Sequence, residues 1–233
     1  MPEKAVQRYY FLLKHTSKMK KNAIFLLIIC IIEEKCLILQ HEKDRDKKNM
    51  INRELIRVKV VQLTYAYYQN GNNNIDAAEK ELVFSLSKAY DLYNYLLSLM
   101  VAVTKEAREY YNVMDRKARR EQTERPSMRF ADNRFVLQLE NNRMLNEFLE
   151  NKKMTWEKHV EYVKRLFQRI LDAQFYKDYL KSDNDSYEHD KEVWRKIYKA
   201  FIMDNDDLEE LLEDDSLYWN DDKEIVDTFV VKT

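Results

Sequence analysis

Residues 50–71, MINRELIRVKVVQLTYAYYQNG, include the only glycine of the chain, Gly71, directly after a run with helical spacing. At 100° per residue, four apolar side chains fall within about 60° of one another: Ile56, Val60, Leu63 and Tyr67. Arg53 and Arg57 lie along one margin of this face, together with Thr64. The spacing fits an amphipathic helix with two solvated arginines, and the valines at 58, 60 and 61 also allow a strand. Spacing alone therefore assigns no function to this segment.

The polar residues that follow this run predict a helix stop and a new helix start. Gly71 can take the left-handed backbone conformation that ends a helix, and Asp76 with Glu79 fits a capping box for the next one. Apolar residues then repeat at steps of three and four: Leu82, Leu86, Tyr90, Tyr93, Leu97 and Met100. A long helix is expected here, within which Asp91 could cap a restart.

The composition points to an all-α fold. The chain has 233 residues, one Gly, two Pro and 35% charged residues, too few turn formers for a β-rich domain. Its hydrophobic content of 45% is too high for general disorder. A polar connection is expected at about residues 120–131, and a second one at 182–186. Periodic patterns predict helices at residues 136–151, 155–180, 190–203, 206–212 and 221–231.

Charge is distributed unevenly along the chain. The net charge is about +5 for residues 1–49, about +3 for 50–129 and about −9 for 130–233. Six cations lie close together before the change of sign: Arg116, Lys117, Arg119, Arg120, Arg125 and Arg129. Such a run forms either a solvated face or link, or an RNA-binding strip. The acidic region at 204–227 would repel RNA, or shield it from nonspecific contact.

No sequence motif for catalysis or metal binding is present. The chain lacks a glycine-rich phosphate loop, a G-x-S-x-G elbow and an H-E-x-x-H helix. The acidic region lacks the D-x-D-x-D-G loop that arranges calcium ligands. We expect His159 and His189 to be surface residues, and Trp219 with Tyr218 to pack a connection onto the helical core. No catalytic residue, metal or cofactor is expected.

The first 49 residues differ from the rest. They hold both cysteines, Cys30 and Cys36, and a short apolar run at 19–32 that is below the roughly 20 residues needed to span a bilayer. No small-residue cleavage site follows that run. We interpret residues 1–49 as an upstream extension, with a membrane-associating leader as the alternative. The absence of later thiols suits a reducing cytoplasm. Because the apolar run is short, no stable membrane association is expected.

Residues 52–65, N-R-x-x-I-R-x-x-V-V-Q-x-x-Y, resemble the opening helix of the NusB family of transcription antitermination factors. That family pattern is roughly R-x-x-A-R-x-x-A-x-Q-x-L-Y. AYDLYNYLLSLMVAVTKEA at residues 89–107 is similar to the family's following helices. DNRF at 132–135 and SLYWNDDKEIVDTFV at 216–230 are similar to a long variant found in Bacteroides-like bacteria. The resemblance covers about residues 50–233.

The resemblance implies an all-α multi-helix bundle of the NusB type with inserted helices. Its segments would be an upstream extension at 1–49, a NusB-like N-terminal helical segment at 50–125, and an additional helical region at 126–233 that is acidic toward its end. The family's distal helices, N-E-x-x-x-x-A-K and F-x-N-G-x-L-D, have no counterpart in this sequence. We therefore expect an incomplete second subdomain.

Members of the NusB family bind a boxA element in nascent RNA with the ribosomal protein NusE and help RNA polymerase resist termination. The resemblance therefore implies a noncatalytic, cytoplasmic RNA-binding factor with these partners. Position by position, RNA contact falls on Arg53 and Arg57, and more weakly on Gln62 and Tyr65. Arginines neutralise phosphates and stack on the unpaired bases of single strands.

Two other interpretations stay open. One is a helical protein-protein interaction module without RNA binding, whose segregated charge serves a partner surface. The other is the accessory domain of an enzyme, because the same helical fold resembles domains attached to RNA methyltransferases. No cofactor-binding sequence follows in this chain, which disfavours the latter.

Overall fold

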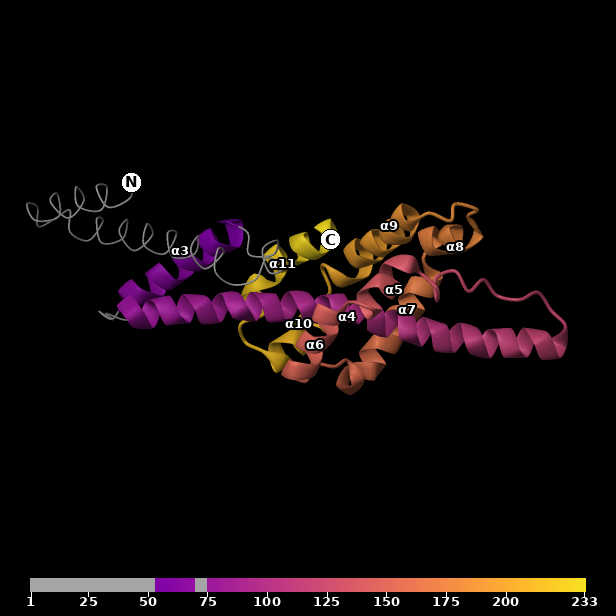
Figure 1. Cartoon of the computed structure of the whole chain (residues 1–233), viewed down its shortest axis with the longest axis horizontal. Helices are drawn as coiled ribbons and strands as arrows, with labels where there is room; N and C mark the ends of the chain where they lie inside the picture. The colour runs from indigo at the N-terminus through magenta and orange to yellow at the C-terminus, as the bar shows by residue number, and fades with distance from the viewer. Residues whose placement is uncertain (1–52, 70–74) are drawn as a thin grey trace, which may run out of the picture. The chain divides into compact units, whose positions relative to one another are not determined.

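A computed structural model describes residues 53–69 and 75–233, and every regular element in these ranges is helical (Figure 1). The α-helices are α3 (Arg53–Gln69), α4 (Ile75–Glu121), α5 (Arg134–Glu140), α6 (Arg143–Lys152), α7 (Val160–Asp172), α8 (Gln174–Lys181), α9 (Tyr187–Ile197), α10 (Asp206–Asp215) and α11 (Asn220–Lys232). A 3-10 helix, η1 (Glu157–His159), precedes α7, and a π-helix, η2 (Tyr198–Ile202), follows α9. The all-α prediction is confirmed. The expected leader at 1–49 and the helix stop at Gly71 lie outside the described residues.

The chain divides into two units, Met1–Ser87 and Lys88–Thr233. Helix α4 is continuous through this boundary, so the expected restart at Asp91 is wrong. Asp91 is instead buried in the middle of the helix, where Lys88 Nζ lies 3.8 Å and Lys152 Nζ 3.3 Å from its carboxylate. A buried carboxylate is tolerated because it gains these cations. The segments expected at 1–49, 50–125 and 126–233 stay a prediction.

The start of α4 also differs from the predicted capping box. The helix begins at Ile75, which places Asp76 in the first turn and not at the cap. A carboxylate in the first turn is still favourable, because it faces the positive end of the helix dipole.

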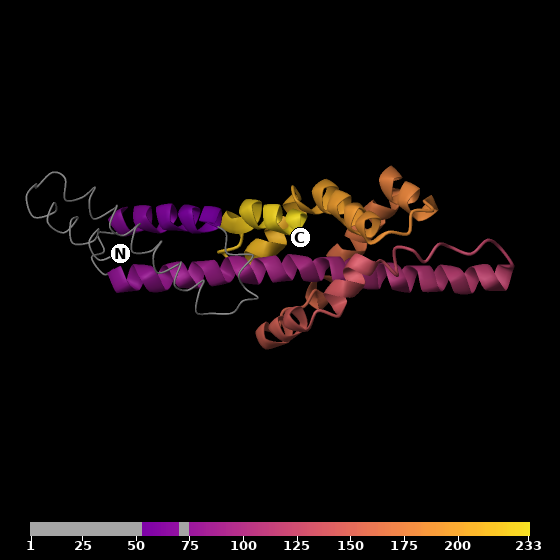
Figure 2. The same ribbon diagram turned by 45° about the horizontal axis from the view of Figure 1, so that its top comes forward.

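Unit 2 is built around the second part of α4, along which the later helices pack (Figure 2). One stripe of this helix is completely buried: Leu92, Leu96, Leu99, Val103 and Ala107. The steps of three and four between these residues keep them on one side of the helix. The stripe supplies the apolar surface that holds unit 2 together.

Two tryptophans fix other elements against α4. The Trp156 ring stacks on Tyr95 with centroids 4.2 Å apart, and its Nε1 donates to the Tyr95 carbonyl at 3.1 Å and to Ser98 Oγ at 3.0 Å. Trp219 Nε1 donates to the Lys88 carbonyl at 3.2 Å. The prediction that Trp219 packs a connection onto the core is confirmed for this residue. Tyr218 beside it stays 41% exposed, so the prediction fails for the tyrosine.

The two helices predicted at 136–151 and 155–180 are each divided in the structure. Asn142 accepts a hydrogen bond from the Leu145 amide and begins α6 as a new helix. Ala173 is extended, with φ −68° and ψ 132°, and separates α7 from α8. Asparagine at a cap satisfies an amide that a helix start leaves unpaired, which favours a break that apolar spacing does not reveal.

The connection predicted at 182–186 is confirmed, and Ser186 ends it as the cap of α9. Its side chain accepts a hydrogen bond from the His189 amide, which places the start of α9 at Tyr187, three residues earlier than predicted. The connection predicted at 120–131 is also confirmed, because no helix lies between Glu121 and Arg134.

Two helices end on non-glycine residues in the left-handed conformation. Gln122 follows α4 and Lys153 follows α6, each with φ 53°. In both places the next amide reaches back five residues: Thr123 N donates to the Ala118 carbonyl, and Met154 N to the Leu149 carbonyl. This is the Schellman arrangement, in which glycine is the usual residue.

Candidate nucleic-acid interface

Helix α3 presents three of the four predicted RNA-contacting side chains to solvent. Arg57 and Gln62 are exposed, and Tyr65 is 67% exposed. Arg57 and Tyr65 lie two turns apart on one strip of the helix, with exposed Val61 between them, and Gln62 borders it. Arg53 is the first residue of α3.

The spacing predicts the buried side of α3 in part: Ile56 and Val60 are buried, whereas Leu63 and Tyr67 are half-buried. Leu55, Ile56 and Val60 are each at most 5% exposed. Thr64, at the margin of the apolar face beside the arginines, is buried, and its Oγ1 donates to the Val60 carbonyl at 2.6 Å. Lys59 is also buried, which the sequence analysis did not anticipate. Because Lys59 is buried, α3 exposes fewer cationic side chains than its sequence suggests.

Tyr65 has one described polar contact. Gln69 Nε2 donates to Tyr65 Oη at 2.8 Å, one turn further along α3. This bond restrains the direction of the phenol and leaves the ring face accessible. An exposed ring of this kind can stack on an unpaired base.

Unit 2 carries a second group of exposed cations, at the end of α4 and in the loop after it. Four lie on the helix and one in the loop: Arg116, Lys117, Arg119, Arg120 and Arg125. We call these five residues the α4 cationic end. Two of them share one acid, because Arg125 Nε lies 2.5 Å and Arg119 Nε 2.8 Å from the Asp115 carboxylate. The hydrogen bond from Arg125 and the nearby charges hold the pKa of Asp115 below its usual range.

Arg129, the sixth cation of the run, has a structural role. Its guanidinium donates to the Ser182 and Asn184 carbonyls and lies 4.5 Å from the centroid of the Tyr179 ring. These contacts hold the chain before α5 to the connection that follows α8. Arg129 is therefore not part of the exposed cationic surface.

The DNRF motif at residues 132–135 forms a buried polar network between α5, α8 and α9. Asn133 caps α5 by accepting from the Val136 amide at 3.2 Å, and its Nδ2 donates to the Asp190 carbonyl at 3.1 Å. The Asp190 carboxylate accepts from Tyr179 Oη at 2.7 Å and from the Arg134 amide at 3.1 Å. The hydrogen-bond partners described here all belong to unit 2. The DNRF motif therefore has a structural role in packing these helices together.

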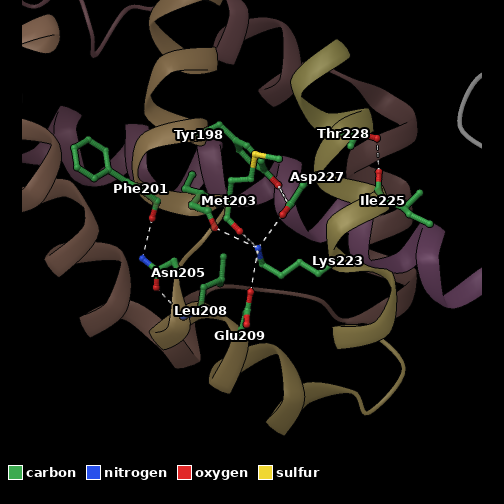
Figure 3. Close-up of polar contacts among 11 residues, drawn as sticks. Tyr198, Phe201, Met203, Asn205, Leu208, Glu209, Lys223, Ile225, Asp227 and Thr228 are labelled. Atoms are coloured by element: carbon green, nitrogen blue, oxygen red, sulfur yellow. Dashed lines mark hydrogen bonds and ion pairs between the residues drawn. The ribbon is translucent and has the colours of Figure 1, made fainter.

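A second buried network surrounds Lys223 of α11 (Figure 3). Its ammonium lies 2.8 Å from Asp227 Oδ2, donates to the Met203 carbonyl, and lies 3.7 Å from Glu209. Tyr198 Oη donates to the other Asp227 oxygen at 2.6 Å. Burial raises the pKa of the Asp227 carboxyl, while the hydrogen bonds from Lys223 and Tyr198 oppose that shift.

The position of Lys223 follows from the π-helix. In η2 the Met203 amide bonds back to the Tyr198 carbonyl at 2.9 Å, so the carbonyls at the end of the element need other donors. The Lys223 ammonium supplies them. The network joins α11 to the segment after α9, and of its charged groups Lys223 and Asp227 are buried while Glu209 is exposed.

The two histidines are more buried than predicted. His159 Nε2 lies 3.3 Å from the Asp215 carboxylate, and its side chain is only 14% exposed. The His189 ring packs 5.3 Å from the Tyr179 ring. Both therefore help to join elements of unit 2, and the surface prediction is wrong.

Neither a metal-binding cluster nor a membrane-spanning helix occurs among the described residues, 53–69 and 75–233. They contain no group of three or more His, Cys, Asp or Glu placed to hold a metal ion. They also contain no helix with both the length and the apolar character to cross a bilayer.

Comparisons with known proteins do not assign the chain to a family. No protein-family model matches it, and neither a curated protein nor a solved structure shows significant similarity to it.

Proposed function

We propose that this protein is a noncatalytic RNA-binding factor that contacts single-stranded RNA through the exposed face of α3. The observation that supports this most directly is the exposure of Arg57, Gln62 and Tyr65 on a helix whose apolar side is buried. A guanidinium, an amide and a phenol ring supply a phosphate contact, a base-edge hydrogen bond and a stacking surface. This combination suits unpaired bases better than a duplex.

The resemblance of residues 52–65 to the NusB family makes the proposal more specific. By analogy, the RNA is a boxA-like element, the partners are NusE and an RNA polymerase antitermination complex, and the setting is the cytoplasm. The NusB-like bundle with an incomplete second subdomain belongs to the same proposal. Arg53 belongs to it on the resemblance alone.

A filter-binding titration of the full chain with single-stranded RNA over a salt series tests the α3 surface. We expect Arg57→Ala to lower the slope of log K against log salt by about 0.7, the share of one phosphate contact. Lys80→Ala removes an exposed cation from α4 and should leave the slope unchanged. Equal slopes for wild type and Arg57→Ala would refute the assignment of Arg57 to RNA.

Tyr65 gives a second readout, independent of charge. Tyr65→Ala should weaken binding by about 1 to 3 kcal/mol, the usual contribution of one base-aromatic stack, with the salt slope unchanged. Tyr65→Phe keeps the ring and removes only the hydroxyl that accepts from Gln69. Retained binding in Tyr65→Phe and loss in Tyr65→Ala would support stacking; equal loss in both would oppose it.

The same strip also favours a second function, a helical protein-interaction module without RNA binding. Val61 is 58% exposed between Arg57 and Tyr65, and exposed apolar side chains beside an aromatic are typical of protein interfaces. Val61→Ser separates the two functions. No RNA binding by the wild-type chain, together with binding of a protein partner that Val61→Ser weakens, would favour protein docking. RNA binding that requires Arg57 would favour the first proposal.

A further inference from the structure

We propose that the α4 cationic end is a second RNA contact, which holds the phosphate backbone of a single strand without reading its sequence. This inference rests on the proposed RNA-binding function and adds a surface to it. It assigns Arg116 and Arg120 as the main phosphate contacts, with Lys117 beside them.

The positions of these side chains on the helix support the proposal. Tyr111 and Ala118 mark the buried side of the last turns of α4. Arg116 and Arg120 are four residues apart, so they lie one above the other on the opposite, solvent-facing side. Two guanidiniums one turn apart, about 6 Å along the axis, form a short cationic row.

The charges of the cationic end are not equally available. Asp115 lies between Arg119 and Arg125 and neutralises part of their charge. Arg116 is exposed, and its Nε donates to the Asn112 carbonyl at 3.2 Å, so that bond does not use its two terminal nitrogens. Glu121 and Glu124 are exposed nearby and reduce the net charge, so we expect a modest, salt-sensitive contact.

The acidic helix α10 lies too far along unit 2 to neutralise this surface. Trp219, just after α10, is bonded to the α4 backbone at Lys88, 28 residues before Arg116. At 1.5 Å per residue this separation is about 40 Å along the α4 axis. Figures 1 and 2 both show α10 and the end of α4 at opposite ends of unit 2. A Debye length of about 8 Å at physiological salt makes the two regions electrostatically independent.

An RNA strand fits this surface better than an acidic protein segment does. Exposed cations spaced one helical turn apart can contact successive phosphates of a flexible strand, which carries one charge per nucleotide. Val113, 56% exposed on the same side, can contact the face of an unstacked base. The exposed acids Glu121 and Glu124 would repel a carboxylate-rich peptide as strongly as they repel phosphate, without any compensating stacking.

Filter binding of the full chain to a single-stranded RNA of random sequence, over a salt series, tests the proposal. Arg116→Gln with Arg120→Gln should lower the salt slope by about 1.4, the share of two phosphate contacts, by the same amount for any sequence. Arg143→Gln with Arg165→Gln removes two exposed cations from α6 and α7 and is the matched control. Circular dichroism of each variant verifies that α4 remains helical.

The Arg57→Ala variant, measured beside these, separates failure of this inference from failure of the proposed function. A loss with Arg57→Ala and none with the α4 pair overturns the second contact and leaves the function in place. A loss with the α4 pair and none with Arg57→Ala supports the second contact and refutes the α3 assignment. Equal losses for the α4 pair and its matched control, or binding of a polyglutamate chain in place of RNA, would overturn the inference.

Discussion

At the scale of single residues, the structure uses buried charge to hold elements together. Lys223 of α11 satisfies carbonyls at the end of η2 and pairs with Asp227, so one ammonium replaces several local hydrogen bonds. Removing one member of a buried ion pair is costlier than removing both, because the remaining charge has no partner. This asymmetry makes the pair testable.

We expect Lys223→Met to lower the free energy of unfolding by about 3 to 5 kcal/mol at neutral pH, and the double variant with Asp227→Asn to lower it less. Urea unfolding of the two single variants and the double variant measures the coupling. Strictly additive losses would contradict the ion pair.

The same pair predicts a pH dependence. A raised pKa means that folded Asp227 keeps its proton to higher pH than unfolded Asp227. Its contribution to stability is therefore full below about pH 3.8 and is lost as pH rises through the folded pKa. Lys223→Met removes a cation that opposes this shift, so its deficit should grow as pH rises through the higher pKa. Urea unfolding of wild type and Lys223→Met across that range measures it, and a deficit independent of pH would be inconsistent with an ionised Asp227.

The left-handed helix ends predict a stabilising change. Lys153 has φ 53°, a conformation that costs a residue with a Cβ roughly 1 to 2 kcal/mol. Lys153→Gly should therefore raise the free energy of unfolding by about 0.5 to 1 kcal/mol, since glycine loses part of that gain to its freedom in the unfolded chain. Asn151→Gly, inside α6, should destabilise instead. Thermal unfolding compares the two, and a destabilised Lys153→Gly would contradict the expected strain.

At the scale of elements, asparagine caps decide where helices begin. Asn133 and Asn142 each accept a hydrogen bond from an amide three residues later. Asn133 is completely buried and also donates to the Asp190 carbonyl, whereas Asn142 is exposed. Asn142 therefore only caps the start of α6. Asn133 caps α5 and also helps to join α5, α8 and α9.

These two caps give a matched pair of substitutions. Asn142→Ala should cost about 1 kcal/mol, the usual value for a cap. Asn133→Ala should cost about 2 to 4 kcal/mol, because it also leaves the Asp190 carbonyl and Tyr179 with fewer partners in a buried place. Urea unfolding compares them, and equal costs would argue against the network.

The elements also show where sequence reasoning succeeds and fails. Spacing predicts the exposed position of Arg57, because periodicity depends only on neighbours along the helix. Gln62 and Tyr65 follow from the resemblance to the NusB family and not from spacing. It misses the division at Asn142, since asparagine is equally compatible with an exposed helix surface. It misplaces Asp91, whose burial depends on Lys152, 61 residues away. Contacts between distant residues leave no local pattern.

At the scale of the whole molecule, charge is separated in space as well as in sequence. Within unit 2 the α4 cationic end and the acidic α10 lie at opposite ends of the unit (Figure 2). This separation lets a polyanion contact one end without meeting the other. The positions of cations and acids in the sequence suggest this separation. The distance between the two regions is set by α4, which is one continuous helix from Ile75 to Glu121.

The burial of the tryptophans gives the molecule a built-in optical reporter of one unit. All three tryptophans of the chain, Trp156, Trp194 and Trp219, lie in unit 2, and each is at most 5% exposed. Tryptophan emission, excited selectively over tyrosine, therefore follows the unfolding of Lys88–Thr233 alone, and it stays blue-shifted until the core of that unit opens. Far-UV ellipticity follows helices of both units, so we expect an additional phase in ellipticity that emission lacks. Superimposable curves would instead mean that the two units unfold as one.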